Sequence, residues 1–227
     1  MSQAPNLLND DGTASIATAL MSSHHAFRRD LARFARALAK VENGDSSRVT
    51  ALREEWKNFR GALHGHHEAE DHGIFPDIAS KHASARATIE RLSADHRRID
   101  PLLTRGDAAF ESLPETASAV ALLHELEELL TPHLATEERE IVPFLRDMKA
   151  FPAPPNDETA AMYADGFAWS THGLASDVIE KINAMLPASV LERLPAARAA
   201  FVARFERSWG TAKAGAARTP IPDAIDD

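Results

Sequence analysis

Histidine is the residue type whose number and spacing point first to chemistry in this sequence. The 227 residues include 11 histidines and no cysteine. Imidazole is the commonest metal ligand in proteins and titrates near neutral pH. The lack of cysteine excludes disulfides, thiolate zinc sites, iron–sulfur clusters and cysteine nucleophiles. Any metal chemistry in this chain must therefore use nitrogen and oxygen ligands.

A pattern of His-x-x-x-Glu occurs twice, at residues 66–76 and 133–143. Each copy has a histidine, an acid four residues later, a second acid directly after the first, and a proline six residues past the first acid. One further histidine precedes each copy, His24 before the first and His96 before the second. Residues four apart on a helix share one face, about 6 Å apart. Each pair can therefore present a nitrogen and an oxygen to one metal ion.

These side chains fall on the apolar faces of the helices that carry them. His24, for example, shares its face with Leu20 and Phe27. An unpaired carboxylate in an apolar core costs several kcal/mol, and shared cations remove that cost. Two copies indicate two metal ions, and imidazole with carboxylate suits iron, manganese or zinc. The alternative is a bundle with buried, hydrogen-bonded histidines and no metal. The six candidate ligands are His24, His66, Glu70, His96, His133 and Glu137.

Apolar residues recur every three or four positions, which predicts an all-α fold. Four long helices with short connections favour an up-down-up-down bundle. Asp45 or Ser46 is the expected N-cap of the second helix, and Pro101 is expected to bend or end the third. The predicted helices span residues 14–41, 46–72, 83–105, 115–148, 158–184 and 188–210.

The same pattern divides the chain into a bundle and an extension. A proline-rich segment at 151–157 is the predicted linker between them. The domain boundaries that we expect are a disordered N-terminus at 1–13, a four-helix bundle at 14–150, the linker, a C-terminal helical extension at 158–210 and a flexible tail at 211–227.

Composition excludes several classes of partner. Lys and Arg total 25 against 34 Asp and Glu, a net charge of −9, which argues against non-specific nucleic-acid binding. No apolar run is long enough to span a membrane. The N-terminal residues lack the basic and apolar regions of a signal peptide, which predicts a cytoplasmic protein. The oligomeric state stays open.

Taken together, the histidines, acids and prolines resemble the hemerythrin-like (HHE cation-binding) domain over roughly residues 14–150. The resemblance implies a four-helix bundle with a non-heme di-iron centre that binds O2, peroxide or nitric oxide. It implies two iron ions (Fe2+/Fe3+) with a bridging oxo or hydroxo group, and manganese and zinc are the alternative metals. By this resemblance the terminal ligands are His24, His66, His96 and His133, and the bridging ligands are Glu70 and Glu137.

The sequence departs from the oxygen-carrying hemerythrins at one ligand. Their third helix supplies two histidines four residues apart, whereas here His96 is followed at that spacing by Asp100. The candidates for a fifth histidine ligand are His67, His25 and His172, in that order. His172 has two alternatives, ordinary helix packing or a lid formed with Trp169 over an open metal position.

Two further acids lie beside the bridging ones in both copies of the pattern. Asp71 and Glu138 are candidates for hydrogen bonds to ligand histidines, and the alternative is that they are simply solvated.

A missing ligand leaves more open metal positions and favours turnover over reversible binding. The sequence therefore predicts a di-iron protein that turns over reactive oxygen species, with peroxidase-like, catalase-like or oxygenase activity. The alternatives are a reversible O2 or NO carrier, and an iron sensor or store. No catalytic residue beyond the metal centre is predicted.

Overall fold

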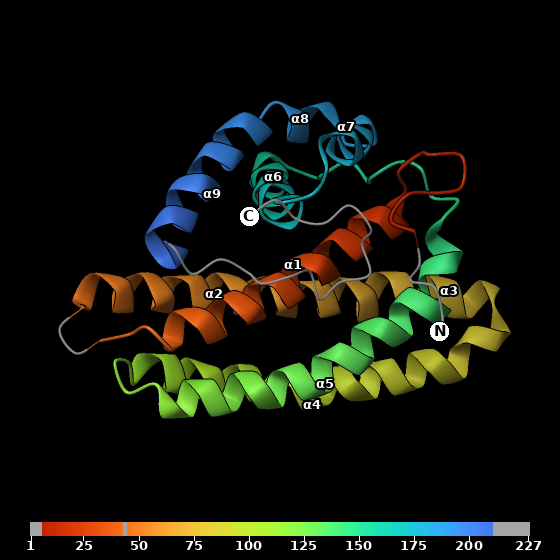
Figure 1. The fold of residues 1–227 in the computed structure, drawn as a ribbon. Helices are drawn as coiled ribbons and strands as arrows, with labels where there is room; N and C mark the ends of the chain where they lie inside the picture. The colour runs from red at the N-terminus through yellow and green to blue at the C-terminus, as the bar shows by residue number, and fades with distance from the viewer. Residues whose placement is uncertain (1–5, 43–44, 211–227) are drawn as a thin grey trace. The chain divides into compact units, whose positions relative to one another are not determined.

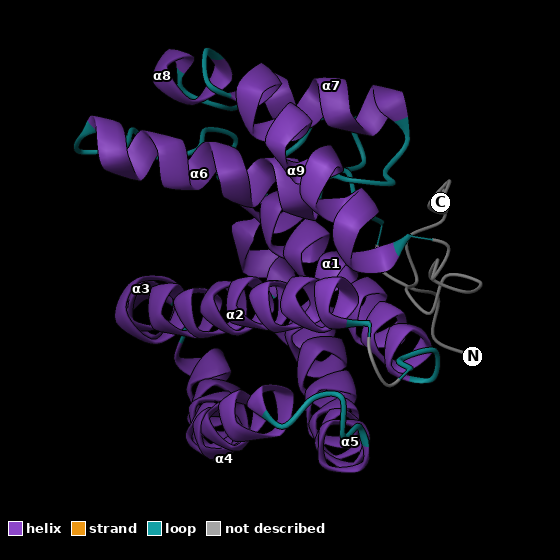
Figure 2. Ribbon diagram, turned by 90° about the vertical axis from the view of Figure 1, so that its left-hand side faces the viewer, coloured by secondary structure: helices purple, strands orange, loops and turns teal. Residues whose placement is uncertain are grey.

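The computed structural model describes residues 6–42 and 45–210, and all regular structure in that part is helical, with no strand (Figure 2). The all-α prediction is therefore confirmed. The predicted tail at 211–227 and the first five residues lie outside the described part. The α-helices are α1 (Ile16–Leu38), α2 (Ser46–Ala69), α3 (Phe75–Lys81), α4 (Arg86–Glu111), α5 (Ala117–Glu140), α6 (Asp157–Ser170), α7 (Ser176–Ala184), α8 (Ala188–Leu191) and α9 (Leu194–Trp209), joined by shorter turns η1 (Glu70–Ile74), η2 (Ala83–Ala85) and η3 (Val142–Leu145).

The chain forms two compact units, described separately below. Within the described residues, unit 1 contains 6–29 and 142–206, and unit 2 contains 30–141 and 207–210. The first half of α1 thus belongs to unit 1 and its second half to unit 2. The domain boundaries expected from the sequence stay predictions.

Unit 2 is built on long helices whose chain direction alternates. The second half of α1, then α2, α4 and α5 run back and forth, as the colour gradient in Figure 1 shows. The helices α2 and α4 approach closely at Gly106, where an added Cβ would lie 1.9 Å from Cζ2 of Trp56. Only glycine leaves room for this indole, which is buried.

The second helix begins as expected, and α2 ends at Ala69, before the predicted end at 72, although helical backbone continues through η1 and α3 to Lys81. Asp45 is its N-cap, and the Asp45 side chain accepts a hydrogen bond from the Arg48 backbone N–H at 3.1 Å. After Ala69 the backbone widens into the π-helical turn η1, in which the Phe75 N–H donates to the Glu70 carbonyl. Pro76 then lies in the first turn of α3, directly after this π turn.

Proline does not end the helix α4. It runs through Pro101 to Glu111, six residues past the predicted end. Leu102, Leu103 and Phe110 are buried beyond the proline, so burial of this apolar face outweighs the hydrogen bond that Pro101 removes. In contrast, α5 ends at Glu140, and Pro143 lies in the following turn η3.

In unit 1 the two helices expected after the linker are each divided. The break between α6 and α7 contains Gly173 at φ 86, a left-handed conformation that favours glycine. The Arg29 guanidinium donates to the carbonyls of Trp169 at 3.1 Å and His172 at 2.8 Å, and so satisfies the open carbonyl end of α6.

Residues 6–13, which the sequence predicts to be disordered, make defined contacts in unit 1. Leu7 is buried. Arg146 donates to the Leu8 carbonyl at 2.9 Å, and the Asn9 side-chain amide donates to the Arg146 carbonyl at 3.0 Å. The segment is held because one guanidinium satisfies several of its backbone carbonyls.

Candidate metal centre

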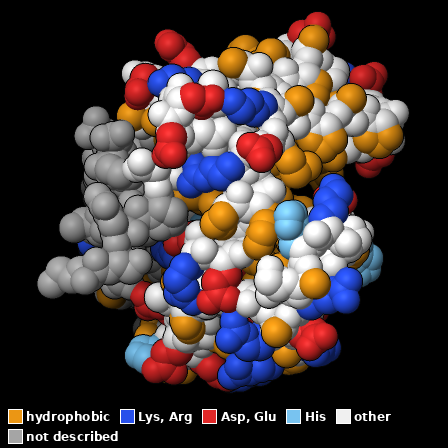
Figure 3. Space-filling model, turned by 90° about the vertical axis from the view of Figure 1, so that its right-hand side faces the viewer, with side chains coloured by type: hydrophobic (Ala, Val, Ile, Leu, Met, Phe, Trp, Pro, Cys, Tyr) orange, Lys and Arg blue, Asp and Glu red, His pale blue; other side chains and the backbone are white. Residues whose placement is uncertain are grey.

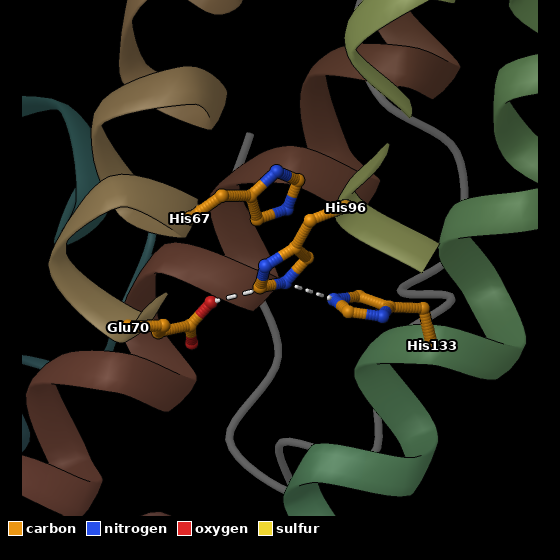
Figure 4. A group of neighbouring side chains, drawn as sticks. All are labelled: His67, Glu70, His96 and His133. Carbon is orange, nitrogen blue, oxygen red and sulfur yellow. Dashed lines mark hydrogen bonds and ion pairs between the residues drawn. The ribbon is translucent and has the colours of Figure 1, made fainter. Parts of the chain in front are cut away.

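Four buried side chains of unit 2 converge in the helical bundle, as Figure 4 shows. His67 comes from α2, Glu70 from the π turn, His96 from α4 and His133 from α5. One nitrogen or oxygen atom of each lies within 4.8 Å of the corresponding atoms of the others. This spacing suits one cation placed between them.

His96 occupies the middle of this cluster. Its Nε2 atom lies 3.2 Å from Nε2 of His133, 3.6 Å from Oε2 of Glu70 and 4.0 Å from Oε1 of Glu137 (Figure 4 draws the first two). A single imidazole N–H can satisfy only one of these atoms. The remaining nitrogen and oxygen atoms are close enough together for one metal ion to bind them.

His67 is the residue whose surroundings fit a metal most clearly. It is 3% exposed, and neither of its ring nitrogens has a hydrogen-bond partner in the described part of the chain. Its ring stacks on His96, with ring centres 4.0 Å apart, and meets the His133 ring edge-on at 5.5 Å. Buried polar atoms in proteins are normally satisfied. A metal ion is a partner that this pocket of nitrogen and oxygen donors fits.

Burial favours the neutral form of two histidines in the cluster. Burial lowers the pKa of His67, and the neighbouring rings of His96 and His66 lower it further. Burial also lowers the pKa of His96, although its hydrogen bond with Asp71 opposes that shift. Neutral imidazoles are the form that binds metal.

The pKa of Glu70 shifts in the opposite direction to the pKa values of these histidines. Burial raises the pKa of Glu70 well above its usual value, and the neighbouring carboxylates of Glu137 and Asp71 raise it further. Without a cation, the carboxyl group therefore retains its proton at pH values where an exposed glutamate is ionised. A bound cation would favour the ionised form.

Both His-x-x-x-Glu pairs are brought together. His66 Nε2 lies 3.2 Å from Glu70 Oε1, and His133 Nε2 lies 3.3 Å from Glu137 Oε1. Both glutamates are buried. The structure thus places five of the six predicted ligands in unit 2, with each acid against the histidine of its own helix.

Asp71 lies on the outer side of His96. Its Oδ2 atom is 2.8 Å from His96 Nδ1, and its Oδ1 atom accepts a hydrogen bond from Ser93 Oγ at 2.6 Å. The Phe75 ring stacks on the His96 ring at 5.7 Å. Sequence reasoning did not identify Ser93, although its position three residues before His96 on the same helix face is a usable signal. Glu138, the matching acid of the second copy, is buried.

The remaining candidates belong to unit 1. His24 and His25 are buried on the first half of α1, and their roles as ligands stay predictions. The His172 ring packs against Phe201 and Phe205, both at 5.0 Å. Trp169 packs on Phe27 at 5.1 Å. Both side chains thus contact aromatic rings of unit 1, and the roles of His172 as a ligand or as part of a lid stay predictions.

The surface is charged and mixed in sign. Figure 3 shows Lys and Arg side chains next to Asp and Glu side chains on the face that it displays. Ion pairs such as Arg91 with Glu140 at 3.2 Å and Lys81 with Asp77 at 2.7 Å account for part of this pattern. Among the described residues, no helix has both the length and the apolar character that crossing a membrane requires.

Comparison with protein families decides what this bundle is. The model of the hemerythrin HHE cation-binding domain matches residues 15–145. The chain belongs to this family. All six predicted ligands, and His67, lie within the matched range, whereas His172 and the helices α6 to α9 lie beyond it. No curated protein and no solved structure matches the chain. The family's cation-binding character agrees with the cluster of histidines and glutamates in unit 2.

Proposed function

We propose that this HHE domain holds two iron ions at its histidine–glutamate cluster and there binds O2, peroxide or nitric oxide. One observation carries the proposal: buried histidine and glutamate atoms converge while both ring nitrogens of His67 have no hydrogen-bond partner in the described part of the chain. Imidazole and carboxylate donors without sulfur suit iron, with manganese and zinc as alternatives.

The bridging role that we propose for Glu70 is supported by the way its two oxygens point. Oε1 lies nearest His66, at 3.2 Å, and Oε2 lies 3.6 Å from His96. A carboxylate with its oxygens facing ligands on different helices is oriented to bridge two ions. For Glu137 the support is its burial and its contact with His133 at 3.3 Å. The proposed terminal ligands are His24, His66, His96 and His133.

We assign the fifth histidine to His67. Asp100 stands where the third helix of oxygen-carrying hemerythrins has its second histidine, and its side chain is 54% exposed and lies 3.6 Å from His64 on the surface. Asp100 therefore faces away from the buried cluster, while the His67 ring is stacked on His96 inside it. The helix α2 would then supply neighbouring histidines, His66 and His67, to the same centre.

When bound, the iron pair supplies the redox chemistry and the open coordination positions for a small oxygen or nitrogen ligand. The protein's own part is to hold neutral imidazoles and two carboxylates in a buried site. The lowered pKa values of His67 and His96 favour the neutral imidazole, in which one of the two ring nitrogens has a lone pair available to a metal. We further propose turnover of a reactive oxygen species such as peroxide. Because His67 as a fifth histidine would fill one of the positions that a missing ligand leaves open, the peroxide experiment below decides between turnover and reversible binding.

The proposal is tested by metal analysis and an absorption spectrum of the full chain, first as purified and then after peroxide. We expect about two iron ions per chain, by analogy with the paired carboxylates of di-iron bundles, and oxygen release from peroxide. Glu70→Ala and Glu137→Ala should each lose iron. Glu55→Ala is the matched control, because Glu55 is a buried acid too but lies on α2, outside the His-x-x-x-Glu pattern. Full iron retention by both variants would contradict the bridging roles.

The two alternatives differ from turnover in what they predict. A reversible carrier forms a stable oxygenated species in the visible spectrum and releases no oxygen from peroxide. An iron sensor or store shows a large change in folding or stability with metal occupancy, because metal binding can supply folding free energy. Either result would contradict the proposed turnover, but it would still agree with metal binding at the cluster.

A further inference from the structure

Two consecutive acids lie on opposite sides of one imidazole. Glu70 Oε2 lies 3.6 Å from His96 Nε2, and Asp71 Oδ2 lies 2.8 Å from His96 Nδ1. The ring of His96 therefore has one acid on its inner side, toward the cluster, and another on its outer side. Both acids come from the first two residues of the π turn, a backbone form that is frequent at functional sites.

The outer acid is itself held in place. Ser93 Oγ donates to Asp71 Oδ1 at 2.6 Å, so both oxygens of Asp71 are engaged by residues of α4. An ionised carboxylate only accepts hydrogen bonds. The contact of Asp71 with His96 therefore requires the hydrogen on Nδ1, which leaves the Nε2 lone pair directed at the cluster.

His133 has no comparable support. Its outer nitrogen, Nδ1, lies 3.8 Å from Asp95 Oδ2, beyond hydrogen-bond distance. Asp95 is engaged instead by Arg98 at 3.0 Å. Of these two neighbouring histidines, His96 alone has its tautomer fixed by a direct hydrogen bond to a carboxylate.

We propose that Asp71 and Ser93 are positioning residues that fix His96 as the Nδ1–H tautomer, so that Nε2 is preformed as a metal ligand before any ion arrives. The inference rests on the proposed function for the meaning of that ligand. A carboxylate behind a ligand histidine orients the ring and raises its basicity, and its loss typically weakens metal binding 10–100-fold.

The test has one readout that needs no metal. Two-bond 1H–15N correlation spectra of the metal-free, histidine-labelled chain report which ring nitrogen of His96 carries the hydrogen. We expect Nδ1–H in the native chain and loss of that preference in Asp71→Ala. Asp71→Asn should restore it in part, because the amide oxygen can still accept from Nδ1–H. Ser93→Ala should give an intermediate result, since Asp71 keeps its contact with His96.

The second readout is affinity for Fe2+ under anaerobic conditions, measured by competition with a chelator. We expect Asp71→Ala to lose about 10–100-fold, and Ser93→Ala to lose less. Asp95→Ala is the matched control, because it removes a nearby acid that does not reach its histidine, and its His96 tautomer should be unchanged.

An unchanged His96 tautomer in a folded Asp71→Ala or Ser93→Ala chain would overturn the proposal, and so would undiminished Fe2+ affinity in both. Circular dichroism establishes that each variant is folded, and Ser93→Ala carries the test if Asp71→Ala does not fold. Failure of the native chain to take up iron contradicts the proposed function alone, because the tautomer is measured without metal.

Discussion

The two ends of unit 2 use the same helices for opposite purposes. At one end, Trp56 of α2 stacks on Phe110 of α4 with ring centres 4.6 Å apart, and its indole N–H donates to Asp107 at 2.9 Å. Phe34 of α1 packs on both rings. Every polar atom of this indole is satisfied. At the other end, the His67 nitrogens are buried without a hydrogen-bond partner in the described part of the chain. The aromatic end therefore stabilises the fold by packing and a satisfied hydrogen bond, whereas the histidine end contains buried polar atoms that the described residues do not satisfy.

The largest effect is expected at the aromatic end. Trp56→Ala should lower the free energy of unfolding of the metal-free chain by about 3–5 kcal/mol, since it leaves a large cavity. Urea unfolding measures this. Trp56→Phe is the control, because it keeps a ring against Phe110 and removes only the hydrogen bond to Asp107. A loss below about 1 kcal/mol in Trp56→Ala would show that this end does not carry the fold.

Close packing at the same end gives the next largest effect. Gly106→Ala should lower the free energy of unfolding by about 1–3 kcal/mol, because the added methyl group overlaps the Trp56 ring. Gly61→Ala is the matched control on the exposed side of α2, where nothing lies within 4 Å of a new Cβ. It should raise the stability by up to about 1 kcal/mol. Equal effects of the two substitutions would contradict the packing argument.

At the histidine end, replacing a polar side chain by an apolar one should raise the free energy of unfolding rather than lower it. His67→Leu removes two buried nitrogens that have no hydrogen-bond partner among the described residues. We expect the metal-free chain to gain about 1–2 kcal/mol in unfolding free energy, while its affinity for Fe2+ falls. Parallel urea unfolding and metal titration measure both. A destabilised metal-free chain would show that His67 serves the fold rather than the metal.

The smallest effect concerns pH. Between its usual pKa of 4.5 and its raised value, folded Glu70 holds a proton that the unfolded chain has lost. Stability from this group is therefore present at low pH and is lost as the pH rises through that window. Metal binding must displace the proton, so affinity should rise up to tenfold per pH unit there, about 1.4 kcal/mol. Calorimetry in two buffers of different ionisation enthalpy counts the protons released. Metal binding without proton release would contradict the raised pKa.

Much of the fold was predictable because helix periodicity and caps are local signals. The helices α1 and α2 lie close to where the apolar spacing predicts them, and Asp45 caps α2. The helix α5 begins near its predicted start but ends at Glu140, well before the predicted end at 148. The extension of α4 through Pro101 was not predictable, because it depends on burial of Phe110 against Trp56, a contact between distant parts of the chain. The division between α6 and α7 depends on Gly173 and on the Arg29 guanidinium, which a local pattern does not reveal.

The candidate site was predictable to the level of residue types and helix faces. Spacing by four predicted that each glutamate lies near its histidine, at 3.2 Å and 3.3 Å in the structure. Spacing alone placed His67 about 100° from His66 on the helix and could not bring it into the cluster. The sequence therefore named His67 only as a candidate, and the structure was needed to place it next to His96, because that position depends on how α2 and α4 pack.

The two copies of the histidine–glutamate pattern end on different backbones. The Glu70 carbonyl accepts from the N–H of Phe75, five residues on, whereas the Glu137 carbonyl accepts from the N–H of Ile141, four residues on. A design that transfers this site to an ideal four-helix bundle would therefore have to include the π-helical turn that begins at Glu70 as well as the side chains. Two copies of the motif on identical α-helical backbones would reproduce its sequence but would misorient the side chains of one copy.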